Sequence, residues 1–148
     1  MPKPRIAVTM GDPAGIGPEI CIDLLNDQEI SGQCIPIVFG DWNILQACAD
    51  KTNKSFVASK ISVSEFSDIH NPAVFDHAII GPTNFTPGTA DAKTGQATYN
   101  YITSAIETTQ AGKINAVVTC PANKEAMQAG GGAQPGHTEI FAEHSGTK

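Results

Sequence analysis

A glycine-rich run at residues 9–19 stands between two apolar segments, and it constrains the fold more than any other stretch of the sequence. The segment 6–8 before it is apolar, and the segment 20–25 after it is largely apolar. Three glycines permit tight turns and close approach to the backbone, and Pro18 suits the first turn of a helix. The pattern therefore predicts a strand, a tight loop and a helix.

The sequence leaves two interpretations of this loop open. Backbone N–H groups left free at a helix N-terminus favour a phosphate or a carboxylate. The alternative is a well-capped turn without a ligand. The dinucleotide fingerprint is not met, because Ile20 stands where Gly or Ala is required, and no Gly-Lys-Ser/Thr follows as in a P-loop. Asp12 would repel a phosphate in this loop unless a cation lay between them.

Strand and helix patterns alternate along the rest of the chain. Apolar segments at 35–39, 74–80 and 114–120 predict strands, the last of them buried on both faces, and 56–58 could form another. Asp41 is expected to cap a helix that begins at Trp42. A further helix through 97–106 is expected to end at Gly112. The alternation predicts an α/β fold with three layers and a mostly parallel sheet.

Ligands of such sheets bind beyond the carboxyl ends of the strands, which here are followed by the loops 9–18, 81–94 and 119–124. Lys124, at the start of a predicted helix, could meet an anion there or could be a solvated surface lysine. After a glycine-rich joint near 130–132, His137 and Thr138 stand at a second junction of loop and helix. They could bind a ligand, or they could form a helix cap with a partly exposed histidine.

The composition narrows the class of protein. The chain has 148 residues and a formal charge of −6, and its lysines are scattered, which argues against a nucleic-acid partner. No apolar run approaches the roughly 20 residues that cross a bilayer, and no export signal stands at the start, so a cytoplasmic protein is expected. The four cysteines lack the spacing of a zinc site and are interpreted as reduced core residues, with disulfides as the alternative.

Three motifs follow one another along the chain. They are Met-Gly-Asp-Pro-Ala-Gly-Ile-Gly-Pro-Glu at 10–19, Val-Thr-Cys-Pro-Ala-Asn-Lys-Glu-Ala at 118–126 and Pro-Gly-His-Thr-Glu at 135–139. In this order and spacing the sequence resembles the 4-hydroxythreonine-4-phosphate dehydrogenase family of vitamin B6 (pyridoxal phosphate) biosynthesis. The resemblance implies a fold similar to that of isocitrate and isopropylmalate dehydrogenases.

The resemblance also implies a reaction. It is the oxidation of 4-phosphohydroxy-L-threonine with NAD or NADP, followed by decarboxylation, in a homodimer that uses a divalent metal (Zn, Mg, Mn or Co). The third motif of the family supplies two substrate contacts, which by position are His137 and Thr138. Asp12 and Lys124 are weaker catalytic candidates. The partner implied is a phosphorylated small molecule, with no nucleic acid or membrane.

Members of the family are roughly twice as long, and the resemblance places their metal ligands and most of their cofactor site after Lys148. Residues 1–148 are therefore expected to be the N-terminal half of a two-domain dehydrogenase, inactive by itself and without a metal site of its own. Two alternatives remain. One is a sister dehydrogenase for threonate or erythronate 4-phosphate, and the other is a non-catalytic phosphate-binding module.

Overall fold

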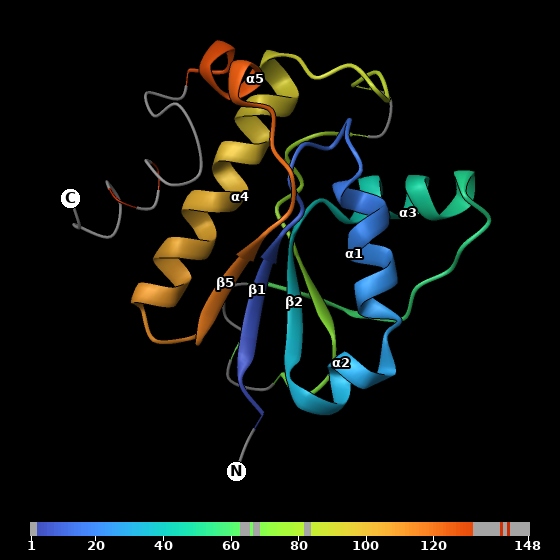
Figure 1. The fold of residues 1–148 in the computed structure, drawn as a ribbon, viewed down its shortest axis with the longest axis vertical. Helices are drawn as coiled ribbons and strands as arrows, with labels where there is room; N and C mark the ends of the chain where they lie inside the picture. The colour runs from blue at the N-terminus through green and yellow to red at the C-terminus, as the bar shows by residue number, and fades with distance from the viewer. Residues whose placement is uncertain are drawn as a thin grey trace.

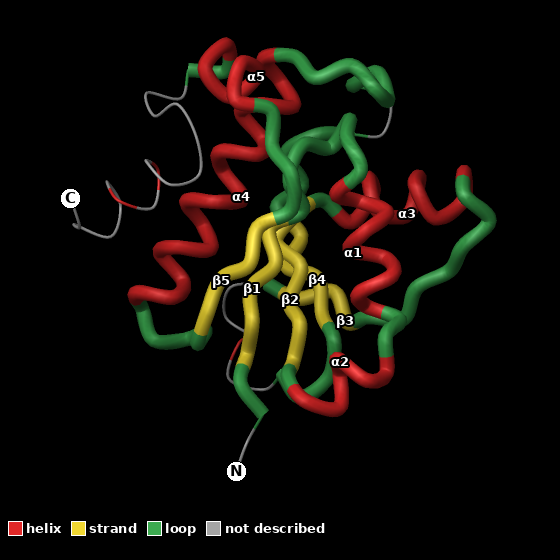
Figure 2. Tube along the Cα trace, viewed as in Figure 1, coloured by secondary structure: helices red, strands yellow, loops and turns green. Residues whose placement is uncertain are grey.

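A five-stranded sheet forms the centre of the computed structural model, which describes residues 3–62, 66, 69–81, 84–131, 140 and 142. The strand order is β3-β4-β2-β1-β5, and every neighbouring pair is parallel (Figures 1 and 2). The strands are β1 (Arg5–Thr9), β2 (Ile35–Gly40), β3 (Ser59–Ile61), β4 (Ala73–Asp76) and β5 (Ala116–Thr119). Because parallel strands need crossover connections, helices are expected on both faces of the sheet.

Helices cover both faces of the sheet, which confirms the three-layer prediction. They are α1 (Gly17–Leu25), α2 (Gln28–Gln33), α3 (Trp42–Lys51), α4 (Ala92–Gln110) and α5 (Lys124–Ala129). Helix α4 packs against β1, β2 and β5 on one side, whereas α1 and α3 lie on the other side (Figure 1). The short helix α5 packs against α4. Gly112, at φ +79°, follows the last turn of α4, as expected of a helix-ending glycine.

The core lies on both sides of the central strands. All six residues of β2 are buried, and Ile37, Val38 and Phe39 are completely so. A smaller apolar cluster, formed by Ile102, Ile106, Met127 and Ile140, joins α4 to α5. Apolar side chains at helical spacing on α4 therefore pack into two clusters. One lies between α4 and the sheet, and the other lies between α4 and α5.

The expected strand 74–80 is shorter in the structure, and the expected cap of α3 is wrong. Strand β4 ends at Asp76, because Ala78 adopts φ +51° and the N–H groups of Ile79 and Ile80 donate to the Asp41 carboxylate at 3.0 and 2.6 Å. Asp41 does occupy the N-cap position of α3, but its side chain makes no capping bond. The N–H of Trp42 donates instead to Asp76, at 3.0 Å.

Three other expectations need correction. Residues 56–58 form no strand, and β3 lies just after them. Helix α2 was not expected, although its N-cap Asp27 accepts from two backbone N–H groups. Strand β5 is not buried on both faces, because Val118 on one face is 53% exposed. None of the helices in the described part of the chain is both long and apolar enough to span a membrane.

Candidate functional site

Three loops meet where the parallel strands end, as the sequence predicts. Asp12, which follows β1, accepts a hydrogen bond from the Thr94 hydroxyl at 3.0 Å, and its backbone N–H donates to the Pro121 carbonyl at 3.2 Å. The N–H of Gly88 donates to the Ala14 carbonyl at 2.8 Å. Figure 2 shows these loops gathered at one end of the sheet. We call this region, made of residues 10–16, 84–95 and 119–124, the three-loop junction.

Two glycines of the loop allow the three-loop junction to form, because neither has a side chain that would collide with the neighbouring backbone. Gly11 has φ +77°, and a Cβ atom there would overlap the carbonyl oxygen of Pro121. A Cβ atom on Gly17 would overlap the carbonyl oxygen of Met10. These glycines therefore allow close packing of the protein against itself, which is a different use from the approach of a ligand.

Asp12 fills the inside of the glycine-rich loop. The residue is 4% exposed, and its carboxylate accepts from the N–H of Ala14 at 2.8 Å. Its own carbonyl accepts from the N–H of Gly15 at 2.9 Å. The expectation that the loop leaves its N–H groups free is wrong for Ala14 and Gly15, because a short acidic side chain satisfies such groups locally. The turn is thus closed at residues 12–15, whereas Ile16, at the N-cap position of α1, provides no side-chain cap.

The burial of Asp12 changes its acid–base behaviour. Removal from water raises the pKa of the carboxyl group above its ordinary value of 3.8, while hydrogen bonds from Ala14 and Thr94 lower it by less. The nearby carboxylate of Asp91 also raises the pKa. In this arrangement the Asp12 carboxylate accepts hydrogen bonds from groups of the protein itself, and it links the glycine-rich loop to the start of α4.

Thr94 is a junction residue that the sequence interpretation missed. It belongs to a capping box at the start of α4, in which the N–H of Thr94 donates to the Asp91 carboxylate at 3.0 Å. The N–H of Asp91 donates in return to the Thr94 hydroxyl at 2.9 Å. An Asp-x-x-Thr pattern before a helix was the available signal, because residues three apart can cap each other at a helix start.

Lys124 is the last residue of the three-loop junction, at the point where α5 begins. It is the first residue of α5, and Asn123 caps that helix by accepting from the N–H of Ala126 at 2.8 Å. Lys124 is exposed and makes no ion pair with the described residues. Its link to Asp12 is therefore the backbone contact at Pro121, three residues earlier. His137 and Thr138 lie outside the described residues.

A pocket of about 290 Å³ borders the glycine-rich loop. Its walls are mainly apolar and come from the loop, from α3 and from residues 85–87, with Lys51 as its charged residue. Such a pocket can contact an apolar or ring-shaped group, but it offers few polar partners for a phosphate.

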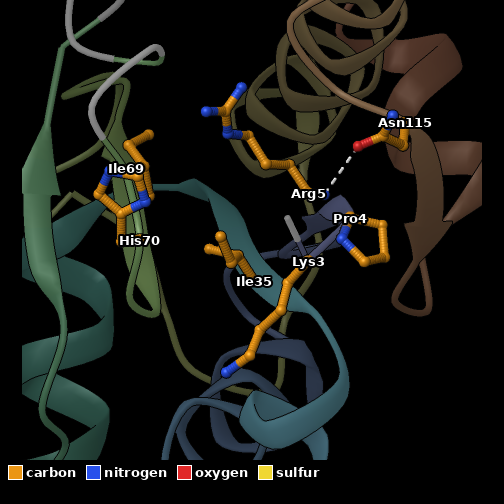
Figure 3. A pocket seen from close by; sticks show the side chains of 7 residues that line it. All are labelled: Lys3, Pro4, Arg5, Ile35, Ile69, His70 and Asn115. Carbon is orange, nitrogen blue, oxygen red and sulfur yellow. Dashed lines mark hydrogen bonds between the residues drawn. The ribbon is translucent and has the colours of Figure 1, made fainter. Parts of the chain in front are cut away.

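Another depression, of about 520 Å³, lies at the opposite end of the sheet. It is lined by basic side chains and by the first residues of β1 and β2 (Figure 3). The side chains of Lys3, Arg5 and His70 extend in different directions and do not converge on one point (Figure 3). This arrangement does not form an anion site, since binding an anion requires donors that meet at one place.

His77, just after β4, is a structural histidine. Its Nδ1 lies 2.9 Å from the Phe75 carbonyl and therefore carries the proton, and its Nε2 lies 2.9 Å from the Ser104 hydroxyl. Burial lowers the pKa of His77, an effect that hydrogen bonds to backbone carbonyls partly offset. The ring is held neutral among aromatic side chains, which suits packing better than proton transfer.

The resemblance implies a divalent metal and a dinucleotide, and the described residues can be compared with each. Within the described ranges, no three His, Cys, Asp or Glu side chains come together to hold a metal ion. The glycine-rich loop does not fit the pyrophosphate of a dinucleotide, because the Asp12 carboxylate occupies its interior and takes the N–H of Ala14.

This parallel α/β sheet, with polar loops at the carboxyl ends of its strands, is a fold that dehydrogenases of known structure share. The crystal structure of a 4-hydroxythreonine-4-phosphate dehydrogenase from Burkholderia phymatum matches 99% of this chain with a TM-score of 0.89 and 34% identity. The chain belongs to the family of the pyridoxal phosphate biosynthetic protein PdxA, whose model matches residues 32–148.

Curated relatives carry two different names. A 4-hydroxythreonine-4-phosphate dehydrogenase from Trichlorobacter lovleyi is 37% identical and is matched over 96% of this chain and 43% of its own length. A D-threonate 4-phosphate dehydrogenase from Cupriavidus necator is 36% identical and is matched over 97% of this chain and 44% of its own length. The chain thus spans less than half the length of the relatives it matches, including 44% of the Burkholderia structure.

Proposed function

We propose that the chain supplies the N-terminal part of the active site of a dehydrogenase that acts on a phosphorylated four-carbon acid. The leading substrate is 4-phosphohydroxy-L-threonine, oxidised and then decarboxylated in pyridoxal phosphate biosynthesis. The observation that carries the proposal is the three-loop junction, which lies at the ligand-binding edge of the sheet in a chain similar to enzymes of that name.

The proposed roles follow from position and chemistry. His137 and Thr138 contact the substrate, and exposed Lys124 faces its phosphate or carboxylate as a point charge. Asp12 positions the loop from within and does not touch the substrate. A nicotinamide cofactor, when bound, takes the hydride. The cofactor site, a divalent metal site and a homodimer interface belong in this proposal to the longer protein.

A chimera tests the proposal. Residues 1–148 are joined to the unmatched C-terminal part of the Trichlorobacter lovleyi enzyme, and the formation of NADH or NADPH from 4-phosphohydroxy-L-threonine is followed by absorbance. The chimera is expected to turn over the substrate, and the chain alone is expected to be inactive. A folded chimera without turnover would contradict the proposal, and turnover by the chain alone would contradict its dependence on the longer protein.

The substrate is the second question for this chimera. Relatives named for D-threonate 4-phosphate, at up to 40% identity, are as similar to this chain as those named for 4-hydroxythreonine 4-phosphate, so both acids are assayed. We expect a higher kcat/KM for 4-phosphohydroxy-L-threonine. A clear preference for the threonate would move the chain to the sister activity, and a repeat with a Cupriavidus C-terminal part separates the contribution of each half.

Calorimetry on the isolated chain addresses the remaining alternative, a phosphate-binding module without catalysis. A module would bind inorganic phosphate and the phosphorylated acid with similar strength, whereas a substrate site is expected to prefer the acid. The occupied N–H groups of Ala14 and Gly15 count against a loop that binds phosphate alone.

A substitution of Lys124 tests its proposed contact with the substrate, and Lys113, another exposed lysine, provides the control. In the chimera, Lys124→Ala is expected to raise KM by about tenfold, because one charge-assisted contact contributes roughly 1.5 kcal/mol or more. Lys113, also exposed but at the far end of α4, provides the control Lys113→Ala, which is expected to leave KM unchanged. Equal effects of both substitutions would show that Lys124 acts only through general charge.

A further inference from the structure

Two buried cysteines from distant parts of the chain lie side by side. The Sγ atoms of Cys21 and Cys120 are 3.8 Å apart, although the residues are 99 positions apart in the sequence. Cys21 is on α1 and is fully buried, whereas Cys120 follows β5 and is 5% exposed. A disulfide needs the sulfur atoms about 2 Å apart, so a movement of about 2 Å would join them.

One member of the pair, Cys120, belongs to the three-loop junction, and the other lies on the helix that follows the glycine-rich loop. A Cβ atom on Gly17, the first residue of α1, would come within 3.4 Å of the Cys120 Cβ. Cys120 immediately precedes Pro121, whose carbonyl accepts from the N–H of Asp12. A bond between the two sulfur atoms would therefore fix α1 to the segment that carries Lys124.

A small oxidant has a route to this pair. Cys120 borders a groove of about 350 Å³ between α1 and β5, whose walls are almost entirely apolar. Ile20 and Val118 on its sides are 41% and 53% exposed, so the groove opens to solvent. Hydrogen peroxide is small and uncharged, and such a groove does not exclude it.

The two thiols differ in acidity. The hydrogen bond from the Cys21 thiol lowers the pKa of Cys120, with burial acting in the opposite direction. The same hydrogen bond and burial raise the pKa of Cys21. Cys120 is therefore the more acidic thiol of the pair, and the thiolate is the form that reacts with peroxides.

We propose that Cys21 and Cys120 form a peroxide-sensitive dithiol that closes to a disulfide. The Cys120 sulfur attacks one oxygen of hydrogen peroxide, the O–O bond breaks, and hydroxide leaves and takes a proton to become water. The Cys120 sulfenic acid that results is attacked by the Cys21 sulfur, the S–O bond breaks, and a second water leaves. Two thiols are oxidised and one peroxide is reduced to two waters.

The other two cysteines differ from the pair in their partners. Cys34 lines the same groove, but its thiol donates to the Ile30 carbonyl at 3.6 Å and not to a second cysteine. Cys48 lies on α3, and its pKa is raised chiefly by burial. They serve as the internal controls.

Peptide mapping of the peroxide-treated chain tests the proposal. In Cys34→Ala/Cys48→Ala only the pair remains, and cleavage after Arg5, Lys51, Lys113 and Lys124 separates its members into peptides 6–51 and 114–124. Dilute peroxide is expected to link these peptides with the loss of two hydrogen atoms, and dithiothreitol is expected to reverse the link. Unlinked peptides with free thiols, or with Cys120 as sulfinic acid, would overturn the proposal.

A second measurement keeps the test valid if the double variant does not fold. In the unmodified chain, cleavage before aspartates places Cys21, Cys34 and Cys48 in separate peptides, because Asp23, Asp27 and Asp41 divide them. The link is expected between the peptides of Cys21 and Cys120 alone. In Cys21→Ala, Cys120 is expected to stop at the sulfenic acid and to react with dimedone. Links that involve Cys34 or Cys48 at the same rate would overturn the assignment.

Discussion

At the scale of single residues, buried carboxylates organise the end of the sheet. Asp12 and Asp41 are 4% and 1% exposed, and both accept backbone N–H groups from loops. Buried carboxylates are costly unless they are well hydrogen-bonded, so each of them ties a loop at the cost of its own desolvation. Two predictions follow from how that balance changes with pH and with substitution.

The first prediction concerns Asp12→Asn and pH. The pKa of Asp12 is raised in the folded state above 3.8, so the folded state keeps this proton to higher pH than the unfolded state. The contribution of Asp12 to the free energy of unfolding is therefore complete below the unfolded pKa and falls as pH rises through the folded pKa. Asn carries no such dependence.

Urea denaturation followed by Trp42 fluorescence measures this effect between about pH 4 and pH 7. The stability of Asp12→Asn relative to the unmodified chain is expected to increase as pH rises through this range. A relative stability that falls with pH would mean that the hydrogen bonds from Ala14 and Thr94 outweigh burial.

The second prediction concerns Asp41. Asp41→Ala removes the acceptor of two backbone N–H groups, at Ile79 and Ile80, and is expected to lower the free energy of unfolding by about 1 to 3 kcal/mol. The control is Asp50→Ala on α3, an exposed carboxylate that accepts one side-chain bond from Gln46. It is expected to change stability by less than about 0.5 kcal/mol. Equal losses in urea denaturation would contradict the role of Asp41.

These residues also show what the sequence could not settle. The Asp41 position at the start of α3 was predictable from local pattern, but the partner of its carboxylate was not, because Ile79 and Ile80 arrive only after β4 has paired with β2. The same holds for Asp12, whose bond with Thr94 joins residues 82 positions apart. A local pattern can predict that a helix start has an acidic residue. Which backbone N–H groups that carboxylate binds depends on the tertiary packing.

At the scale of elements, α4 and α5 approach each other at glycines. A Cβ atom on Gly95 of α4 would overlap the backbone carbonyl of Ala126 in α5, and one on Gly130 would come within 2.6 Å of the Ala92 carbonyl. Backbone contact of this kind leaves no room for even one methyl group. The position of α5, and therefore of Lys124, depends on these two glycines.

The third prediction compares two helical glycines. Gly95→Ala is expected to destabilise the chain by about 1 to 3 kcal/mol, because the added methyl group pushes α5 away. Gly32→Ala in α2 has nothing within 4 Å of the new Cβ and is expected to stabilise by about 0.5 to 1 kcal/mol through helix propensity. Thermal unfolding of both variants measures the difference. A stabilising Gly95→Ala would show that α5 does not pack as described.

Helices and strands were predictable from the sequence where the apolar pattern was long or was bounded by Gly and Pro. The first strand, its loop and α1 were expected in their correct places, because apolar segments flank a run of glycines and Pro18. The short α2 and the end of β4 were not, since six residues carry too little periodicity and the segment 78–80 is apolar without belonging to a strand.

At the scale of the whole molecule, the order of strands decides which surfaces remain open. Strand β5 was expected to be buried on both faces because its residues are apolar, but Val118 is 53% exposed and β1 is its neighbour in the described sheet. The apolar pattern is typical of a strand covered on both faces. The fold class was predictable from the alternation of strand and helix patterns. The exposure of β5 was not predictable, because it depends on which elements pack on that strand.

The fourth prediction tests the edge that β5 leaves. An edge strand with an exposed apolar side chain is a template for pairing with another chain, and a lysine on it reduces such pairing. Val118→Lys is therefore expected to lower the concentration dependence of the sedimentation coefficient. Val57→Lys is the control, because Val57 is 83% exposed but lies outside the strands. Equal effects of the two lysines would point to general charge.

Because β5 is an edge strand of the described sheet, the association state of the isolated chain is expected to depend on how a sample was stored. Pairing between edges is second order in protein and grows with time, so two samples with the same final concentration can differ when one was stored concentrated. Binding constants measured on aged and on freshly diluted chain are then constants of different mixtures. Freshly diluted material, checked by sedimentation on the same day, is the reference state for every comparison between variants.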